Sequence, residues 1–201
     1  MPRIQLSEDE MESMRERLST TALDVYRREG LSALSFRRIA EVAGISHTLP
    51  YRYFENKEAL LARMRADALA TFEAYVREYE SRADSPLGKV QSVAEGYLTF
   101  AREHPEDYML IFATEQPSPE LYPDVLAARR DVFDHVVGVL QRCIDAGLLR
   151  GQAREIAHHF WVALHGLLSL HTADQLVHGM ELDEIVVPLI QRLLGSAMIE
   201  D

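Results

Sequence analysis

The stretch from Leu34 to Lys57 constrains the fold of this chain more than any other part of the sequence. Apolar residues recur there at helical spacing, and Gly44 then supplies a residue that readily adopts the left-handed conformation that stops a helix. Ser35 and Ser46 are placed to cap the helices on either side of that glycine. A helix, a tight glycine turn and a second short helix predict a helix-turn-helix, whose second helix enters the major groove of DNA.

The same stretch resembles a known family. The runs IAEVAGIS and YRYFENKEALL are similar to the DNA-binding domain of TetR-family transcriptional regulators, including the turn glycine, the aromatic pair Tyr51 and Phe54, and Lys57 at the start of the next helix. The resemblance covers about residues 8–60. It implies a homodimeric repressor that binds a palindromic operator in double-stranded DNA and is released by a small-molecule effector of unknown identity. The aromatic and methionine content suggests that the effector is largely apolar, although the same residues would fill any core.

The whole chain shows helical periodicity and no strand-like alternation, so the predicted fold class is all-α. We expect an N-terminal three-helix helix-turn-helix domain at residues 1–56 and, from the resemblance, a helical dimerisation and ligand-binding domain at 57–201. A first helix over 7–29 opens with an S-x-x-E capping box, and a long helix over 57–80 connects the two domains. Later elements are expected as helices over roughly 86–103, 124–146, 152–177 and 182–198, with a turn cluster at 116–119.

The charge is distributed unevenly along the chain. The formal net charge of −11 argues against a nucleic-acid partner when it is taken as a whole. Residues 27–65, however, hold eight basic and four acidic side chains, whereas the 136 residues after position 65 hold ten basic and 22 acidic ones. The asymmetry favours phosphate contact through the N-terminal part. An acidic C-terminal domain is also common for solubility alone, so both explanations stay open.

Three features indicate the compartment. Cys143 is the only cysteine and cannot form an internal disulfide, which is typical of a reducing compartment. The chain opens polar and acidic, without the apolar run of a signal peptide. No segment approaches the roughly 18 uninterrupted apolar residues of a membrane span. We therefore expect a cytoplasmic protein without a membrane partner.

Phosphate contact is expected at the second helix of the motif and just after it. Lys57 lies beside the positive end of a helix, the hydroxyl of Tyr51 can donate, and Thr48 is a further candidate. Family members usually carry a threonine where this chain has Leu49, so Thr48 is the available hydroxyl one residue earlier. Pro50 lies in the first turn, where it removes at most one hydrogen bond, so we expect the helix to survive with a tightened start.

Base reading is expected from Arg37, His47 and Arg52, because an arginine can bind guanine through two hydrogen bonds. Exposed arginines are also ordinary solvated surface charges, so Arg37 has both interpretations. Tyr53 is expected either to contact a sugar or to shield the core.

Aromatic residues and histidines gather on the helix expected over 152–177. Trp161 and His165 lie four residues apart and share a face, and W-x-x-x-H-G resembles a motif of one TetR subgroup. In one interpretation the two side chains line an effector cavity; in the other they fill the core. The candidates for effector binding are Tyr79, Phe100, Tyr108, Phe112, Phe133, Trp161 and His165.

The histidines also suggest a metal site. His158, His165 and His171 are spaced seven and six residues apart, so the third drifts from the face of the first two. The sequence holds no nucleophile motif, phosphate loop or H-E-x-x-H. We expect no metal, no cofactor and no enzymatic activity. The alternatives are an effector-independent architectural or partner-binding protein and, less favoured, a histidine-based metal protein or enzyme.

Leucine-rich stripes on the last two expected helices suit a four-helix interface between two subunits. The alternative is that these stripes pack in the core of a single subunit, which must bury at least part of both. The candidate interface residues are Leu164, Leu167, Leu168, His171, Ile185, Leu189 and Leu193.

Overall fold

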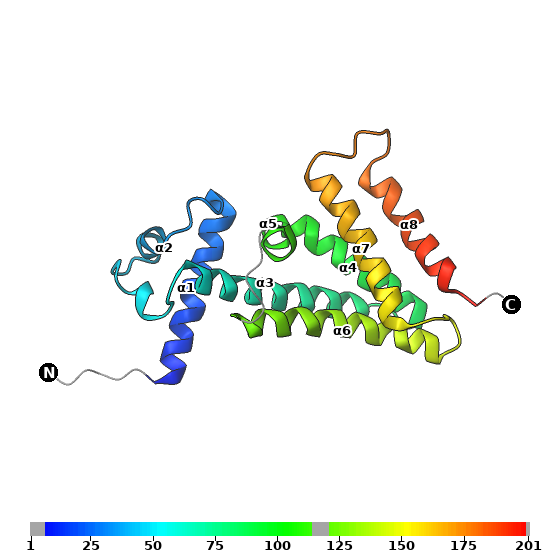
Figure 1. Cartoon of the computed structure of the whole chain (residues 1–201), viewed down its shortest axis with the longest axis horizontal. Coiled ribbons are helices and arrows are strands. Elements are labelled where there is room, and N and C mark those ends of the chain that lie inside the picture. Colours follow the sequence, from blue (N-terminus) through cyan, green and yellow to red (C-terminus); the bar gives the residue numbers. More distant parts are fainter. Residues whose placement is uncertain (1–6, 114–120, 200–201) are drawn as a thin grey trace. The chain divides into compact units, whose positions relative to one another are not determined.

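The computed structural model describes residues 7–113 and 121–199, and within these ranges the chain consists of helices joined by short connections (Figure 1). The predicted all-α fold class is confirmed. The β pairing found among the described residues is an isolated bridge between Leu149 and Met198. None of the helices in these ranges combines the length and apolar content that a bilayer crossing needs. The turn predicted at 116–119 lies outside the described residues.

The helices form two compact units. The N-terminal unit contains the residues up to 68 together with 109–126, and the C-terminal unit contains 69–108 and the chain from 127 onward. The division therefore falls within the long predicted helix, and a segment from the middle of the sequence belongs to the N-terminal unit. The functional boundary expected between 56 and 57 stays a prediction.

Local signals define the helices of the N-terminal unit. The Ser7 hydroxyl accepts from the Glu10 N–H at 3.2 Å while the Glu10 carboxylate accepts from the Ser7 N–H at 2.8 Å, which confirms the capping box. Ser35 and Asn56 cap the next two helices through their side chains, and Gly44 ends the second with a φ of 65°. The elements are α1, Glu8–Glu29; α2, Phe36–Ala43; a 3₁₀ turn, η1, Pro50–Arg52; α3, Lys57–Glu80; and a π-helical turn, η2, Met109–Ala113.

One hydrophobic core holds these elements together. Leu18 of α1, Ile39 of α2 and Met64 of α3 are almost inaccessible, and Leu110 of η2 belongs to the same cluster. The Leu110 carbonyl accepts from Nε of the buried Arg65 at 3.4 Å. Burying a large aliphatic side chain contributes about 1.5–3 kcal/mol, so these contacts fix α1, α2 and the first part of α3 as one body.

The predicted form of the second helix in the motif is wrong. Instead of an α-helix from Ser46, the chain makes a turn followed by the short η1. Pro50 has no N–H to donate to the Ser46 carbonyl, which accepts from the Leu49 N–H at 2.9 Å. The Arg52 N–H then donates to the Leu49 carbonyl at 3.0 Å. The tightening expected at the start therefore extends through the segment, because the proline lies where the first α-helical hydrogen bond would form.

The C-terminal unit contains the end of α3 and the helices that follow. The Ser85 hydroxyl accepts from the Gly88 N–H at 3.1 Å, which confirms the predicted start of α4. The helices α7 and α8 lie side by side, in yellow to red in Figure 1. The elements are α4, Pro86–Glu103; α5, Pro105–Tyr108; α6, Pro123–Asp145, which starts within the N-terminal unit; α7, Ala153–Thr172; and α8, Leu182–Ala197.

The helix α7 ends at Thr172 rather than near residue 177. Asp174 adopts a φ of 53°, and the Gln175 N–H donates to the Leu170 carbonyl at 2.8 Å. A left-handed residue with such a bond closes a helix end, and an aspartate takes the place that glycine usually occupies.

Close packing of α4 on α3 depends on Gly96. A Cβ at this position would lie 2.9 Å from the Tyr79 Cβ and 3.1 Å from the Tyr75 carbonyl oxygen, closer than non-bonded atoms normally approach. The short separation also brings Phe100 against Phe72, with ring centroids 5.1 Å apart. The core of the C-terminal unit is thus centred on these aromatic rings.

Candidate functional site

The side chains predicted to contact DNA gather on α2, on the turn after it and at the start of α3. Tyr53 is an exception, because it is only 8% exposed and belongs to the core of the N-terminal unit. Of the two roles predicted for Tyr53, the structure therefore supports core packing. The other candidates are exposed: Arg37, His47, Thr48, Tyr51, Arg52 and Lys57.

Tyr51 and Lys57 are each anchored while their polar ends keep hydrogen-bonding capacity. The Tyr51 ring packs edge-on against the buried Phe36, with centroids 4.7 Å apart, yet the residue is 65% exposed. The Lys57 ammonium donates to the Leu31 carbonyl at 3.3 Å and has two further N–H groups. A hydroxyl and an ammonium held in this way suit contact with phosphate oxygens.

The turn between α2 and η1 presents two hydroxyls. The Ser46 Oγ lies 3.0 Å from the Thr48 Oγ1, so Ser46 bonds to its neighbour rather than capping a helix as predicted. Leu49 is half-buried and Pro50 is buried. The hydroxyls available for phosphate therefore come from positions 46 and 48.

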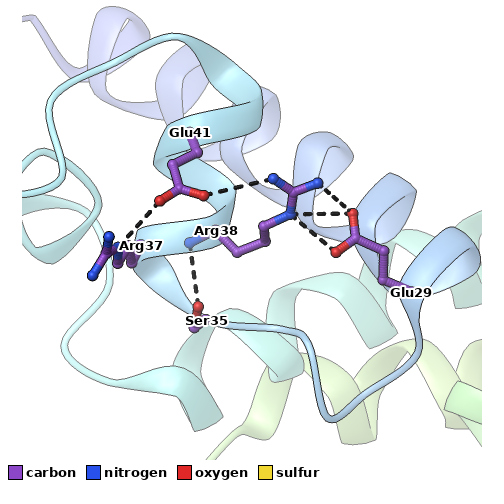
Figure 2. Close-up of polar contacts among 5 residues, drawn as sticks. All are labelled: Glu29, Ser35, Arg37, Arg38 and Glu41. Carbon is purple, nitrogen blue, oxygen red and sulfur yellow. Dashed lines mark hydrogen bonds and ion pairs between the residues drawn. The ribbon is translucent and has the colours of Figure 1, made fainter.

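The two adjacent arginines of α2 have different surroundings, which Figure 2 shows. Arg38 donates through Nε and Nη2 to the Glu29 carboxylate of α1 at 2.7–3.1 Å, and the hydrogen bond to Glu29 is the main reason why its pKa is raised. The Arg37 side chain is 81% exposed and donates through Nε to Glu41 at 3.1 Å. Arg38 thus ties α2 to α1, whereas Arg37 keeps its charge in solvent.

In the C-terminal unit, a chain of hydrogen bonds links α4, α5 and α7. The Tyr97 and Tyr108 hydroxyls lie 3.3 Å apart, and the Tyr108 hydroxyl lies 2.7 Å from His165 Nδ1. The far nitrogen of His165, Nε2, lies 3.5 Å from the Ser169 hydroxyl one turn further along α7. Two buried phenols therefore end on an imidazole that is only partly buried.

Burial determines the protonation of the three hydrogen-bonded side chains Tyr97, Tyr108 and His165. It raises the pKa of Tyr108 to about 12 and the pKa of Tyr97 well above its ordinary value. It lowers the pKa of His165 below the ordinary 6.5. All three side chains are uncharged at neutral pH. Nδ1 of the neutral imidazole accepts from the Tyr108 hydroxyl when the proton is on Nε2, and donates to that hydroxyl in the other tautomer.

Aromatic rings continue from His165 toward the surface. Trp161 is 41% exposed and stacks on His165, with an interplanar angle of 21° and centroids 6.2 Å apart. Phe133 of α6 meets Trp161 edge-on at 6.4 Å and lies 4.5 Å from the His158 ring. The structure thus brings together four of the predicted effector residues: Tyr108, Phe133, Trp161 and His165.

The other predicted effector residues lie elsewhere. Phe100 is fully buried in the packing of α3 against α4. Tyr79 is 9% exposed, and the Arg82 guanidinium lies 3.6 Å from its ring centroid. Phe112 belongs to the N-terminal unit. Tyr79 and Phe100 therefore serve the core that Gly96 makes possible.

The predicted interface residues divide by burial. Leu164, Leu167 and Leu168 are each at most 6% exposed within a single chain, so they pack inside it and leave little surface for a partner. His171 of α7 is exposed, and the α8 residues are half-buried: Ile185, Leu189 and Leu193. Three apolar side chains on the same two helices do face solvent: Val162, Leu170 and Val187.

Among the described residues, no three side chains of His, Cys, Asp or Glu come together as a metal ion requires. His158 bonds through Nδ1 to the Arg154 carbonyl at 2.7 Å, and His171 is exposed at the end of α7. His158, His165 and His171 therefore do not meet as a set of metal ligands.

Two members of the hydrogen-bonded chain, Tyr97 and Ser169, were missed from the sequence. Ser169 lies four residues after His165, so helical spacing placed both on one face and could have indicated it. Tyr97 offered no such signal, because its partner Tyr108 lies on another helix beyond a break at Pro105.

Comparison with known proteins identifies both parts of the chain. Residues 18–64 match the family described as bacterial regulatory proteins, tetR family. Residues 90–193, just over half of the chain, match the tetracyclin repressor-like C-terminal domain.

The curated relatives are transcriptional regulators and include both a repressor and an activator. The regulator Rv1816 of Mycobacterium tuberculosis is 27% identical over 146 residues, which cover 70% of this chain and 61% of that protein. The repressor NicS of Pseudomonas putida is 24% identical, covering 70% and 66%, and the activator FasR of Mycolicibacterium smegmatis is 25% identical, covering 71% and 65%. This chain thus spans about three fifths to two thirds of the length of these relatives.

Solved structures share the fold. A protein of unknown function from Rhodococcus sp. RHA1 superposes with a TM-score of 0.82 at 24% identity, covering 99% of this chain and all of that one. The regulator FadR of Bacillus subtilis, solved with stearoyl-CoA, has a TM-score of 0.71 at 16% identity and covers 89% and 97%.

Proposed function

This chain belongs to the TetR family of bacterial regulatory proteins, and from that premise we propose that it is a sequence-specific, DNA-binding repressor of transcription. The observation that carries the proposal is the exposed polar surface around the turn between α2 and η1, which a rigid core supports. Arg37, Tyr51 and Arg52 are exposed there, while Phe36 and Tyr53 beneath them are buried. Rigid support with free polar ends is what contact with a duplex requires.

The test is binding of the purified protein to the DNA upstream of its own gene, against a scrambled duplex, over a series of salt concentrations. We expect a preference of about 10³-fold or more that persists at physiological salt. Equal binding to both duplexes that disappears as salt rises would instead indicate non-specific phosphate attraction and an architectural protein. A reporter gene behind the bound DNA then distinguishes a repressor, which lowers transcription, from an activator.

For the effector, we propose an uncharged, largely apolar or aromatic molecule that binds at Trp161 and His165. Tyr108 and Ser169, the polar groups that contact His165, are neutral, and a charged ligand group beside them would lose its hydration without gaining an opposite charge there. The Arg154 guanidinium lies further out, 5.7 Å from the Phe133 ring centroid. His165 and Tyr108 supply the hydrogen-bonding end, and Trp161 and Phe133 supply apolar ring surface. Release of DNA requires the effector to bind the DNA-free form more tightly than the DNA-bound form.

Trp161 is the only tryptophan, so its fluorescence reports directly on this site. We would titrate the protein with 2-naphthol, which is uncharged at neutral pH, and with 2-naphthoate, its charged counterpart of similar size. Tighter binding of the uncharged compound, lost in His165→Ala, supports the proposal. Equal or tighter binding of the naphthoate would contradict the assignment of a neutral site.

We propose, further, that the protein is a homodimer that uses the outer faces of α7 and α8. Val162 is 64% exposed, Val187 55% and Leu170 48%, a concentration of apolar surface that a partner would cover. Sedimentation should show a dimer that Val187→Arg weakens. Val177→Arg, at a 70% exposed position after α7, is the matched control and should leave the dimer intact. A monomeric wild-type protein at micromolar concentration would overturn this part.

A further inference from the structure

Four charged side chains lie in alternating order between α1 and the exposed end of α2 (Figure 2). Glu29 accepts from Arg38, Arg38 approaches the second oxygen of Glu41 at 3.6 Å, and the first oxygen of Glu41 accepts from Arg37 Nε at 3.1 Å. The Glu29 side chain is 33% exposed, those of Arg38 and Glu41 are 40% and 39% exposed, and that of Arg37 is 81% exposed. The series therefore begins at the C-terminal end of α1 and ends at a side chain in solvent.

Helix stability does not account for this arrangement. Arg37 and Arg38 occupy the first turn of α2, where the positive end of the helix disfavours cations. The pair Arg37 and Glu41 also has the less favourable order, with the basic residue N-terminal to the acidic one. The exposed pair of Arg37 and Glu41 contributes little to folding. Where a sequence breaks local preferences in this way, a functional reason is expected.

The contact with Glu41 uses one particular edge of the Arg37 guanidinium. The bond is made by Nε, which leaves the two terminal nitrogens of Arg37 for another partner. Those two nitrogens form the fork that binds the O6 and N7 atoms of guanine. Glu41 stays ionised for this role, since the hydrogen bond from Arg37 lowers the pKa of its carboxyl.

We infer that Glu41 is a positioning residue for base reading: it holds Arg37 by Nε and directs the terminal nitrogens of Arg37 at a guanine in the major groove. Arg38 and Glu29 fix Glu41 in turn. This inference rests on the proposed function, because it assumes that the α2 surface faces DNA. It assigns roles to three side chains that do not themselves touch the base.

The first test needs no DNA. In ¹⁵N NMR of the free protein, the Nε–H signals of Arg37 and Arg38 should both be ordered and protected from exchange. In Glu41→Ala the Arg37 signal should lose its protection while the Arg38 signal keeps it through Glu29. An Arg37 signal as mobile in the wild type as in Glu41→Ala would overturn the inference, whatever the DNA experiments show.

The second test measures specificity on the upstream DNA bound by the wild type. In Glu41→Ala the Arg37 side chain is no longer held in the free protein. It must then be ordered when DNA binds, which should lower the affinity for that DNA about 2- to 12-fold. Affinity for the scrambled duplex should stay equal or rise, since a negative charge has been removed. Glu41→Gln should recover part of the loss, because its amide oxygen can still accept from Nε. Glu16→Gln, an exposed carboxylate of α1, controls for the change in net charge.

The decisive measurement is base-pair substitution through the bound site. In Glu41→Ala, discrimination should fall at one G·C pair per half-site and stay unchanged at the others. The same pair should already be insensitive in Arg37→Ala, in which Glu41→Ala has no further effect. If Glu41→Ala instead raises the affinity for both duplexes alike, Glu41 only repels phosphate and the positioning role is wrong. If the wild-type protein shows no preference between duplexes, the proposed function fails, and the NMR test alone decides the Arg37–Glu41 contact.

Discussion

The two sites proposed for binding, one in each unit, place their tyrosine hydroxyls in opposite surroundings. In the N-terminal unit, Tyr51 packs its ring on Phe36 and leaves its hydroxyl in solvent, so the hydrogen-bonding end waits for an external partner. In the C-terminal unit, Tyr97, Tyr108 and His165 bond to one another. The first arrangement can bind without internal change, whereas a ligand at the second must compete with an existing hydrogen bond.

The largest effect should come from the core on which the second arrangement rests. Phe100→Ala removes a fully buried ring that contacts Phe72, Tyr75 and His104. We expect a loss of about 3–5 kcal/mol in the free energy of unfolding, measured by urea denaturation. A loss below about 1 kcal/mol would mean that the α3–α4 packing tolerates a cavity and that the C-terminal unit is less rigid than its contacts suggest.

Tyr108→Phe sharpens the comparison by removing one oxygen atom. The buried Tyr97 hydroxyl and His165 Nδ1 both lose a partner, so the free energy of unfolding should fall by about 1–3 kcal/mol. DNA binding by the folded protein should be unchanged. An unchanged melting curve would show that water replaces the hydroxyl and that the chain is more open than its burial implies.

Tyr51→Phe is the same chemical change in the other unit, and its expected outcome is the reverse. The ring contact with Phe36 remains, so stability should stay within about 0.5 kcal/mol. Affinity should fall by about 1–2 kcal/mol for the operator and the scrambled duplex alike, because a phosphate contact carries no sequence information. A loss confined to the operator would move Tyr51 from phosphate positioning to base reading.

The smallest effect should be the pH dependence of the C-terminal unit. The pKa of His165 is lowered by burial, so the unfolded chain takes up the proton more readily than the folded one. The stability that the neutral imidazole provides is complete above its unfolded pKa of about 6.5 and is lost progressively as the pH falls below it. We expect a decrease in the free energy of unfolding as the pH falls, together with a change in Trp161 fluorescence whose midpoint lies below pH 6.5. His165→Gln should remove that fluorescence transition, and a midpoint above 6.5 would contradict the burial.

The sequence predicted the parts of the fold that depend on local chemistry. Ser7 and Ser35 cap helices where expected, because an N-cap needs only its own side chain and the next turn of backbone. Gly44 ends α2 for an equally local reason. The starts of α1 and α2 and the end of α2 therefore needed no knowledge of the tertiary structure.

The errors have two causes, one local to the backbone and one in longer-range packing. Pro50 was expected to cost one bond, but its position four residues after Ser46 removed the bond that begins an α-helix. Leu164 and Leu167 have the same periodicity whether a neighbouring helix or a second subunit covers them. The partner of Arg38 lies nine residues earlier across a turn, beyond the reach of helical spacing.

Because Leu110 belongs to the core of the N-terminal unit, a truncated DNA-binding fragment should be unstable. A fragment that stops after α3, or at residue 68, keeps every side chain expected to touch DNA and still loses Leu110 from among Leu18, Ile39 and Met64. The same cut takes the carbonyl that accepts from the buried Arg65, so a cation would be left in an apolar space with that bond missing. Such a fragment should aggregate or melt early, and DNA binding should be measured on the full chain.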